Sequence, residues 1–448
     1  MVGLGTAGLY SSRAAQRFNR RARVTIFEKR GYHMFSPCGI PYALGGMVES
    51  FESLKHTVPT TRSLEIFLRH EVVDGDTVGK RVKVVDLDSG EERWVEYDSL
   101  ILATGSVPRV LDVPGAREFL GRGVYTVSTP EDGERLRRLA EESEACCVVG
   151  GGAIGMEIAL ALRHLGLEVH ITKRSEQPLP RNIDPDMGGL LLDHLVEKGL
   201  KVYFGKGIDS INGSGKVESV TIAGETIPVD FVVMSVGVDG NVELAKRMGL
   251  ECEGGAIKTN RRMETSAPDV YAVGDNCWSF SLIDGSPTRV ALATTAYRQA
   301  LVAGVNAAGG DAEYEGTLGT FVSYVGDLEV SSTGFNTRAA EAAGFRVVSG
   351  RVNTLTKPSF IPGAKPISLK VLADADSGRV LGAHAVGEEG TDWRINMVAL
   401  AIRKGMTLEE LSRVELAYCP PVSELYDPLL MAVDVALRKL EAARRRAS

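Results

Sequence analysis

The chain has 448 residues, 44% of them hydrophobic and 24% charged, which are ordinary values for a globular protein. This length exceeds what one hydrophobic core usually supports, so two or three domains are expected. The net charge of −7 does not favour a nucleic-acid partner, and no segment has the pattern of a membrane-spanning helix or a signal peptide. We therefore expect a cytoplasmic protein that binds neither nucleic acid nor membrane.

The first glycine motif stands at the N-terminus, where Gly3, Gly5 and Gly8 follow the order Gly-x-Gly-x-x-Gly ahead of a helix-compatible run. About twenty residues later, the apolar segment 23–28 ends in an acid, Glu28, which is the spacing typical of a dinucleotide-binding unit. In such a unit the glycines let a pyrophosphate approach a helix N-terminus, and the acid accepts hydrogen bonds from a ribose. The strand before Gly3 is unusually short.

A single cysteine follows this unit, in the segment 33–42. Cys38 lies between Pro37 and Gly39 in a predicted turn that enters a helix. A reactive cysteine must be a thiolate, and the unpaired N–H groups of a helix N-terminus supply a positive field that favours one. We therefore expect a positive field at Cys38. The alternative is that Cys38 is a small buried packing residue.

None of the six cysteines forms a Cys-x-x-Cys pair, which disfavours a disulfide scaffold, a zinc site and a thioredoxin-type site, so no metal is expected. They are Cys38, Cys146, Cys147, Cys252, Cys277 and Cys419.

Segments 81–86 and 93–97 alternate like the strands of a hairpin. The apolar segment 98–105 then leads into Ala103, Thr104 and Gly105, and a proline-containing turn marks the exit from a domain. A charged surface helix is expected at about residues 131–144.

The second glycine motif follows a clearly apolar strand, with Gly150, Gly152 and Gly155 ahead of another helical pattern. Two such units predict two bound dinucleotides. The next strand, 167–174, ends in Thr172, Lys173 and Arg174 rather than in an acid. Cations at this position accommodate a 2′-phosphate, so NADPH is predicted, with NADH as the other possibility. The alternative is that both cations begin an exposed turn.

The rest of the chain contains a third apolar strand ending in Gly274 and Asp275, which can aim a carboxylate at a ligand. A long helix is predicted over 291–309. From about residue 316 the pattern changes to alternating antiparallel strands, and the helices 393–404 and 426–446 close the chain.

With both glycine motifs, Ala-Thr-Gly, Gly-Asp and one early cysteine, the chain resembles the flavin-dependent pyridine nucleotide–disulfide oxidoreductases over nearly all its length. Residues 36–42 are similar to the single-cysteine branch, which includes coenzyme A-disulfide reductases, NADH oxidases, NADH peroxidases and polysulfide reductases. The two-cysteine branch is excluded because position 43 is Ala43.

The resemblance implies an α/β fold with two Rossmann-like domains and a C-terminal α+β dimerisation domain. The FAD domain would comprise residues 1–110 and 235–315, the NAD(P) domain 111–234, and the dimerisation domain 316–448. Glu28 would meet the FAD ribose, Asp275 the ribitol or pyrophosphate, and Cys38 the isoalloxazine ring.

The positions expected to contact the two cofactors are Gly3, Gly5, Gly8, Glu28, Lys29, Ser36, Ala103, Thr104, Gly105, Arg109, Gly150, Gly152, Ile154, Gly155, Glu157, Thr172, Lys173, Arg174, Gly237, Gly274, Asp275, Ala291 and Thr295.

The implied activity passes electrons from NAD(P)H through FAD to the sulfur species held by Cys38. Attack of the Cys38 thiolate on a disulfide gives a mixed disulfide, and without a second cysteine nearby the other thiol must belong to the substrate. This predicts reduction of a low-molecular-weight disulfide, persulfide or polysulfide. The rivals are an NAD(P)H oxidase that reduces oxygen and a flavin-based redox sensor without turnover.

Within the branch, the peroxidases and water-forming oxidases have a histidine just before the last glycine of the first loop, where this chain has Ala7. Peroxide and four-electron oxygen chemistry therefore lose support. Tyr418 matches a tyrosine of the coenzyme A-disulfide reductases, in a segment that enters the site of the partner subunit of a homodimer. Their second tyrosine is replaced here by Phe360-Ile361. Cys419 offers a further hypothesis, a resolving thiol brought to Cys38 across the dimer.

Overall fold

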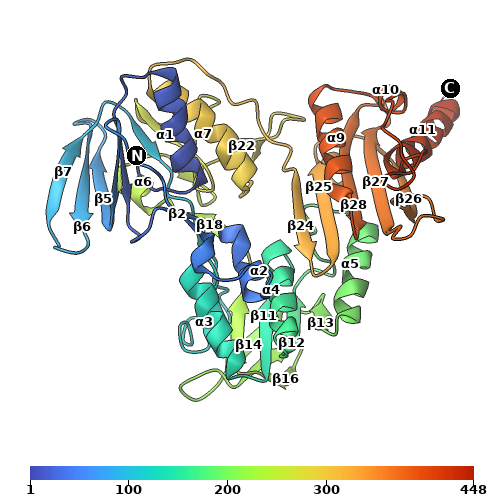
Figure 1. Ribbon diagram of the computed structural model, residues 1–448, viewed down its shortest axis with the longest axis horizontal. Helices are drawn as coiled ribbons and strands as arrows, with labels where there is room; N and C mark the ends of the chain where they lie inside the picture. Colours follow the sequence, from blue (N-terminus) through green and yellow to red (C-terminus); the bar gives the residue numbers. More distant parts are fainter. Residues whose placement is uncertain (448) are drawn as a thin grey trace.

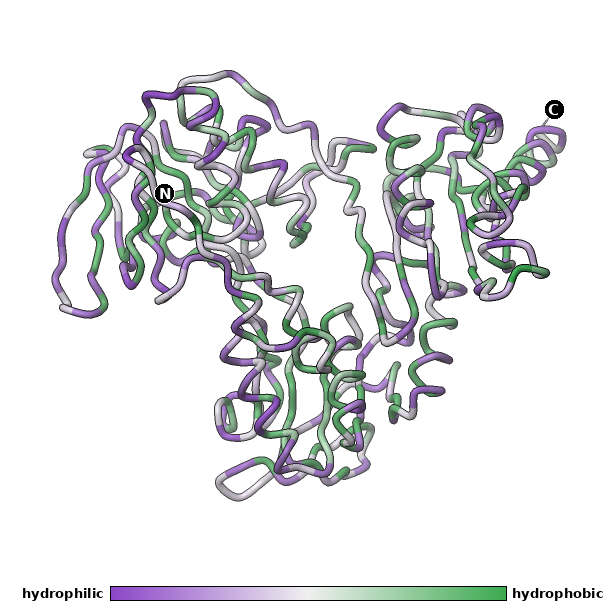
Figure 2. Tube along the Cα trace, in the orientation of Figure 1, coloured by the Kyte–Doolittle hydropathy of each residue, from purple (hydrophilic) through white to green (hydrophobic). Residues whose placement is uncertain are grey.

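The computed structural model describes residues 1–447, which form three bodies, each with its own main sheet (Figure 1). Two of these sheets are built from parallel strand pairs and the third is antiparallel. Hydrophobic residues concentrate along the strands inside the bodies, and hydrophilic residues follow the outer loops (Figure 2). Residue 448, the end of the predicted third domain, lies outside the described residues.

The first body combines two segments of the chain, one before β10 (Val124–Thr126) and one after β17 (Phe231–Met234), around a single layer of parallel strands. Its main elements are α1 (Thr6–Phe18), β1 (Val24–Glu28), β4 (Leu64–Leu68), β8 (Leu100–Leu102), β21 (Val270–Ala272) and α7 (Ala293–Ala307). Strand β1 pairs with β4, and β8 pairs with β21, in both cases in parallel. The helices α1 and α7 pack so closely that a Cβ at Gly304 would lie only 2.3 Å from the carbonyl oxygen of Ser11.

The short first strand of the sequence is a single bridging residue at the centre of this layer. Val2 bridges β1 at Phe27 and β8 at Leu102. The amino group of Met1 donates a hydrogen bond of 2.7 Å to the carbonyl of Thr25. Burial lowers the pKa of this amino group to about 5. The layer is therefore continuous from β4 to β21 although its central strand is minimal.

An outer antiparallel sheet confirms the predicted hairpin and adds one strand to it. Its strands are β5 (His70–Asp76), β6 (Arg81–Asp86) and β7 (Glu92–Glu96). The remaining small elements of this part of the chain are β2 (Met34–Phe35), η1 (Pro37–Gly39), α2 (Ile40–Leu44), η2 (Glu52–Leu54), β3 (Lys55–His56), β9 (Ser106–Pro108), β18 (Val238–Gly240), α6 (Glu243–Arg247), β19 (Cys252–Glu253), β20 (Ala256–Ile257), β22 (Ser279–Phe280) and β23 (Pro287–Thr288).

The second body has a parallel sheet in the order β10-β17-β11-β12-β13, in which β11 is buried throughout except at its first residue. Its elements are β10 (Val124–Thr126), α3 (Pro130–Glu141), β11 (Ala145–Val149), α4 (Ala153–His164), β12 (Glu168–Lys173), α5 (Pro185–Glu197), β13 (Lys201–Phe204) and β17 (Phe231–Met234), with an antiparallel sheet of β14 (Ile208–Asn212), β15 (Ser219–Ile222) and β16 (Glu225–Pro228). The predicted surface helix is α3, which begins at a capping box formed by Thr129 and Asp132.

The third body is the predicted α+β unit, with helices against one antiparallel sheet in the order β24-β25-β28-β27-β26. Its elements are β24 (Phe321–Val325), β25 (Leu328–Gly334), α8 (Thr337–Ala342), β26 (Val347–Leu355), β27 (Pro366–Asp374), β28 (Val380–Gly387), α9 (Thr391–Arg403), α10 (Leu408–Leu411) and α11 (Pro428–Ala447). Strand β28 lies at the centre of the strand order and is buried along its whole length, whereas the edge strand β26 is buried at only two positions.

Candidate active site

The first glycine loop is closed by backbone contacts that leave no room for a side chain. Gly3 has a φ of +97°, and a Cβ there would lie 2.3 Å from the carbonyl oxygen of Ala103. A Cβ at Gly8 would lie 2.1 Å from the carbonyl oxygen of Gly3. At Gly5, in contrast, a Cβ would meet nothing within 4 Å, and this open position is the N-cap of α1 without a side-chain cap. Unpaired N–H groups beside open space fit a dinucleotide pyrophosphate.

The second glycine loop repeats this arrangement at the start of α4. Gly150 has a φ of +129°, and a Cβ there would lie 2.0 Å from the carbonyl oxygen of Ser235. A Cβ at Gly155 would lie 2.1 Å from the carbonyl oxygen of Gly150, while Gly152 again faces open space. Ile154, in the first turn of α4, is 49% exposed and can cover a bound ligand. Both loops therefore fit dinucleotides by the same geometric test.

Glu28, the predicted ribose ligand, is buried at the end of β1 and already holds two protein partners. Its Oε2 accepts hydrogen bonds from the Leu4 N–H at 2.8 Å and from the Arg30 guanidinium at 2.7 Å. Burial alone would raise the pKa of Glu28, but the hydrogen bonds and charge of Arg30 outweigh it and lower that pKa. The sequence interpretation missed Arg30, although a cation two residues after the acid was visible. The neighbouring Lys29 is exposed and pairs with Glu71.

The ends of β8 and β21 meet opposite the first loop and present unpaired polar atoms. The Ser106 hydroxyl donates to Oδ2 of Asp275 at 3.0 Å, and burial raises the pKa of this carboxyl. Asn276 donates its amide to Thr104 Oγ1 at 2.9 Å, yet its own Oδ1 is buried without a hydrogen-bond partner in the described chain. Next to them, Gly274 needs a positive φ of +88°. The buried, unpaired Oδ1 of Asn276 and the half-buried carboxylate of Asp275 fit a ligand rich in hydroxyl groups, such as the ribityl chain of FAD.

Arg109 and Gly237, two of the predicted cofactor residues, lie at the junction between the first and second bodies. The N–H of Arg109 donates to the carbonyl of Gly237 at 3.0 Å, and its guanidinium pairs with Asp239 across β9 and β18. This ion pair raises the pKa of Arg109 and occupies its charge. Both residues therefore have a structural role in the chain.

Four other predicted positions are spread around the first body. Ala103 is buried in the contact with Gly3, and Gly105 has a φ of +67° and faces open space. Ala291 is exposed just before α7, whereas Thr295 inside α7 is buried.

Cys38 lies in the short 3-10 turn η1 that leads into α2. It is an exposed residue with a free thiol. Although the residue as a whole is exposed, its sulfur is partly shielded from water, which raises the pKa of the thiol, and the carboxylates of Glu157 and Asp275 raise that pKa further. The expected positive field is therefore not supplied by the side chains of the described chain, and α2 is only five residues long. The helix α2, which continues from this turn, packs on α3 and α4 of the second body, and Ser36 just before the turn bonds to His56 of β3. Cys38 therefore lies where the two glycine-loop bodies meet.

Ser36, just before this turn, shares a hydrogen bond of 2.8 Å with Nε2 of His56, which joins η1 to the neighbouring strand β3. The backbone supports the same link, because the N–H of Ser36 donates to the carbonyl of Leu54 at 2.9 Å.

Glu157 follows the second glycine motif by two residues and joins α4 to two other elements by hydrogen bonds. Its Oε1 accepts hydrogen bonds from the Tyr42 hydroxyl of α2 at 3.1 Å and from the Ser323 hydroxyl of β24 at 2.6 Å. Burial raises the pKa of this carboxyl. Tyr42 and Ser323 could not be assigned from the sequence, because 115 and 166 residues separate them from Glu157.

The cations predicted to select NADPH gather where β12 ends. Lys173 lies near the carbonyl of Gly151, and burial followed by the charge of Arg181 lowers the pKa of Lys173. Arg174 and Arg181 are both exposed. Thr172 is fully buried and donates its hydroxyl to the carbonyl of Lys206, so this side chain is engaged inside the fold. Arg181 was missed because it follows seven residues after Arg174.

Tyr418 and Cys419 lie on an exposed loop of the third body, between α10 and α11. Tyr418 is 44% exposed, and the neighbouring Val422 and Leu425 are 75% and 69% exposed. The N–H of Cys419 donates to Ser423 Oγ at 3.3 Å. In one chain these residues are not among the groups that act on Cys38.

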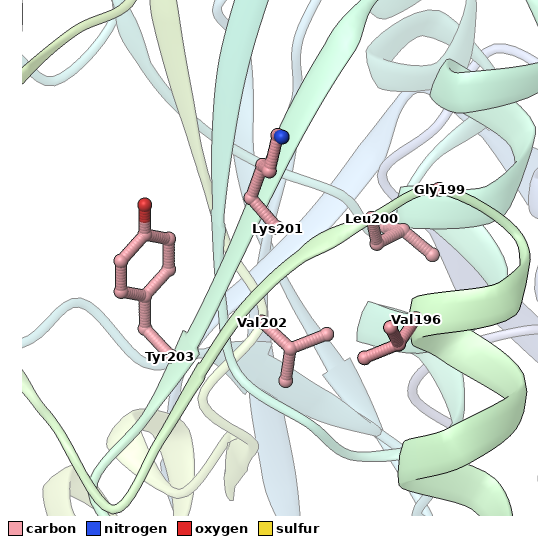
Figure 3. A pocket seen from close by; sticks show the side chains of 6 residues that line it. All are labelled: Val196, Gly199, Leu200, Lys201, Val202 and Tyr203. Atoms are coloured by element: carbon pink, nitrogen blue, oxygen red, sulfur yellow. The ribbon is translucent and has the colours of Figure 1, made fainter.

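The hollow shown in Figure 3 is not part of this constellation. It has a volume of about 430 Å³ and lies along the edge strand β13, beside the end of α5. The hollow is lined by Val196, Gly199, Leu200, Lys201, Val202 and Tyr203. These residues do not form a set of polar groups that point at one ligand. We therefore do not assign a ligand to it.

In the described part of the chain, no group of histidine, cysteine and carboxylate side chains has the arrangement of a metal site. None of the helices described here is both long and apolar enough to cross a membrane.

Comparison with known proteins gives consistent matches over the whole chain. Residues 1–300 match the family described as "Pyridine nucleotide-disulphide oxidoreductase", and residues 321–429 match the dimerisation domain of the same family. The chain is 37% identical over 446 residues to an NADH oxidase of Methanocaldococcus jannaschii, covering 98% of each protein. It is 32% identical over 442 residues to a CoA-dependent NAD(P)H sulfur oxidoreductase of Pyrococcus furiosus, covering 97% of this chain and 98% of the relative.

Among solved structures, the NAD-dependent persulfide reductase of A. fulgidus superposes with a TM-score of 0.93 at 31% identity. The match covers 98% of this chain and 83% of that one. The similar proteins thus include sulfur reductases and oxidases, the two activities between which the sequence interpretation chose.

Proposed function

The chain belongs to the pyridine nucleotide-disulphide oxidoreductase family, and we propose that it is an FAD-dependent NAD(P)H reductase of a low-molecular-weight disulfide, persulfide or polysulfide. The observation that carries the proposal is the position of Cys38. It is a free, exposed thiol where the two glycine-loop bodies meet, with no second cysteine in its turn. The names of the sulfur reductases among its relatives support the same choice.

The two cofactor sites follow from the two glycine loops. The first loop, together with the polar end of β21, would hold FAD, and the loop of Gly150 would hold NAD(P)H. When bound, the flavin supplies two-electron transfer between the nicotinamide and sulfur. The protein contributes close-packed loops that fix both phosphate positions and a turn that presents Cys38 between them.

The sulfur chemistry requires only one protein thiol. The Cys38 thiolate attacks the substrate disulfide, a bond forms between Cys38 Sγ and one substrate sulfur, and the other substrate sulfur leaves as a thiolate. Two electrons from NAD(P)H then release the bound half. Because the described chain places no second thiol beside Cys38, both halves of the substrate leave as thiols of the substrate.

We further propose that NADPH is preferred over NADH. Lys173, Arg174 and Arg181 place three cations at the end of β12, where a ribose 2′-phosphate would lie. Replacing both Lys173 and Arg174 with alanine should raise KM for NADPH about 10²- to 10⁴-fold, because each of the two charged hydrogen bonds contributes roughly 1.5–3 kcal/mol. KM for NADH should stay within about threefold. Equal effects on both nucleotides would contradict the assignment.

We also propose a homodimer in which the loop with Tyr418 enters the partner's site. The match to a dimerisation domain and the exposed apolar residues of this loop support it. Tyr418→Phe should lower the rate with a disulfide while leaving flavin reduction by NADPH unchanged. The six free cysteines favour a reducing compartment such as the cytoplasm.

The second candidate function is an NAD(P)H oxidase, which the name of the 37% identical relative favours. Steady-state oxidation of NADPH separates the two. A rate that needs coenzyme A disulfide, cystine or polysulfide and persists without oxygen supports the reductase, and a rate that needs only oxygen supports the oxidase. Cys38→Ser should lower the disulfide-dependent rate by at least about 100-fold. Full retention of that rate would refute Cys38 as the redox centre.

A further inference from the structure

The start of α8 in the third body holds the loop between β12 and α5 of the second body, residues 174–184. Asn336 donates its side-chain amide to the carbonyl of Pro180 at 3.1 Å. Thr337 donates its backbone N–H and its hydroxyl to the carboxylate of Asp184, at 2.9 Å and 2.6 Å. Asn336 and Asp184 are both buried, which shields these bonds from water. The two bodies are therefore joined at this loop by hydrogen bonds that water does not replace.

Asp184 gives both of its carboxylate oxygens to the third body and neither to its own helix. It occupies the N-cap position of α5, where an aspartate commonly accepts a hydrogen bond from the first turn, yet its side chain forms no such cap. Its Oδ1 accepts from the Thr337 N–H, and its Oδ2 accepts from the Thr337 hydroxyl and lies 2.9 Å from Nζ of Lys370. The carboxylate therefore fixes the loop to the third body instead of capping α5.

The sheet of the third body adds two cations to this contact. Arg351 and Lys370 lie opposite each other on β26 and β27. Lys370 pairs with Asp184 and, at 3.0 Å, with Asp186 in the first turn of α5, and Arg351 lies 3.3 Å from the same Asp186. The helix α5 packs beside β28 of this sheet (Figure 1). Two acids of the second body and two cations of the third thus hold the start of α5 in place.

The same loop also contacts the second glycine loop. The N–H of Leu179 donates to the carbonyl of Gly151 at 3.2 Å, and Nζ of Lys173 lies 3.5 Å from the same carbonyl oxygen. Leu179 has a φ of +47°, in the left-handed region that leucine rarely adopts, and such a conformation persists only where its surroundings hold it. Here Gly151 binds the N–H of Leu179, and Asn336 binds the carbonyl of the next residue, Pro180.

Arg181 lies between the two points at which the third body holds the loop, Pro180 and Asp184. Its side chain is exposed, and its charge reaches Lys173 at the second glycine loop. Because the backbone on both sides of Arg181 is held, the fold limits the positions that its guanidinium can adopt. A cation that is already held in place binds a phosphate more tightly than a mobile one, since less freedom is lost on binding.

Resting on the proposed use of NADPH, we propose that Asn336 and Thr337 are positioning residues for the nicotinamide nucleotide. They hold residues 179–184 against the second glycine loop, which keeps Arg181 in place for the 2′-phosphate on the adenosine ribose. The third body, which matches the dimerisation domain of the family, therefore also sets the affinity of the second body for its nucleotide. When one of these bonds is lost, the loop spends less time in the binding arrangement, and the apparent affinity falls by that fraction.

Equilibrium binding tests this without turnover. Calorimetry of the oxidised, FAD-loaded enzyme with NADP⁺ and with NAD⁺ compares two ligands that differ only in the 2′-phosphate. Asn336→Ser removes the amide that reaches Pro180 but keeps a good N-cap for α8, which Asn336 caps by accepting from the Ala339 N–H at 2.9 Å. Asn336→Ala removes both the cap and the contact.

Lys198→Met is the matched control. The Nζ of Lys198, at the far end of α5, bonds to Asp327 of the third body at 2.7 Å. This variant therefore removes another bond between the same two bodies and leaves residues 174–184 untouched. Flavin absorbance and melting temperature verify the folding of each variant.

We expect Asn336→Ser and Asn336→Ala to raise the Kd of NADP⁺ by the same factor, about 3- to 10-fold, and that of NAD⁺ by less than about twofold. Thr337→Val should act in the same direction, and Lys198→Met should change neither constant. In anaerobic stopped-flow, the NADPH concentration for half-maximal flavin reduction should rise by that factor in Asn336→Ser, with the limiting rate within about twofold. An effect in Asn336→Ala alone would mean a capping role, and an equal loss for both nucleotides would mean a general loosening. Either result overturns the inference.

Arg181→Ala separates this inference from the proposals on which it rests. If Arg181→Ala raises the Kd of NADP⁺ about 10-fold or more while Asn336→Ser leaves it unchanged, only the positioning by the third body is refuted. If Arg181→Ala has no effect, or if wild type binds NAD⁺ more tightly than NADP⁺, the NADPH assignment is wrong and the inference falls with it. None of these measurements uses a disulfide, so the role of Cys38 is decided separately by the disulfide-dependent rate of Cys38→Ser.

Discussion

Replacing Arg394 with methionine should release the loop that carries Tyr418 from the third body. Arg394 lies in α9 and is 1% exposed, and Asp427, just before α11, is 2% exposed. The guanidinium donates from Nε to Oδ1 at 3.0 Å and from Nη2 to Oδ2 at 2.7 Å. This bidentate pair fixes the end of the loop to the helix that packs on the sheet.

The magnitude follows from the burial of both partners. Removing one member of a buried ion pair costs about 3–5 kcal/mol, because the other charge stays uncompensated. Asp427 keeps one other hydrogen bond, from the N–H of Leu429, which does not replace the charge. We therefore expect the free energy of unfolding of the third body to fall by about 4 kcal/mol.

Trp393 provides a local probe, because the Arg394 guanidinium lies 4.2 Å from the centre of its ring system. The measurement uses a background variant in which the other tryptophans, Trp94 and Trp278, are replaced with phenylalanine. Urea unfolding is then followed by the fluorescence of Trp393 at one fixed protein concentration. With m-values of about 1–3 kcal/mol per M, the midpoint should fall by about 1–4 M. The double variant with Asp427→Asn should lose less than the sum of the two single losses.

A loss below about 1 kcal/mol would refute this reasoning, since it would mean that water reaches the carboxylate and compensates for the missing cation.

Three further outcomes are expected. Gly8→Ala should yield protein without flavin absorbance, because the new Cβ would lie 2.1 Å from the carbonyl oxygen of Gly3. Gly150→Ala should keep FAD but slow flavin reduction by NADPH about 100-fold in stopped-flow absorbance, since its Cβ would lie 2.0 Å from the Ser235 carbonyl oxygen. Burial lowers the pKa of His384 to about 4 from 6.5, so the unfolded chain takes up a proton at higher pH than the folded chain. Stability should therefore fall by about 3 kcal/mol as pH drops from about 6.5 to 4, and urea midpoints of His384→Leu should show a flatter pH dependence.

The sequence alone was sufficient for the parts of the protein that depend on short-range patterns. Both glycine loops were predicted because their spacing encodes a strand, a tight turn and a helix within about ten residues. The antiparallel third body followed from alternating strands, although β25 was not anticipated. The turn predicted to lead from Cys38 into a helix is present, but that helix has only five residues. The side chains that act on the thiol are two carboxylates, so the side chains of the described chain do not supply a positive field.

Tertiary structure decided which side chains act together. The sequence predicts that Glu157 contacts a cofactor, which stays a prediction. Only the fold shows that Glu157 also accepts hydrogen bonds from Tyr42 and Ser323, which belong to other elements. The sequence shows Arg30 two residues after Glu28, but only the fold shows that Arg30 donates to this carboxylate and to the carbonyl of Leu4 in the first glycine loop. The spacing of residues along the sequence determines turns and helix starts, since these depend only on contacts between backbone groups that are close in the chain. Partners far apart in the chain meet only when separate sheets pack, and that packing sets the charge around Cys38.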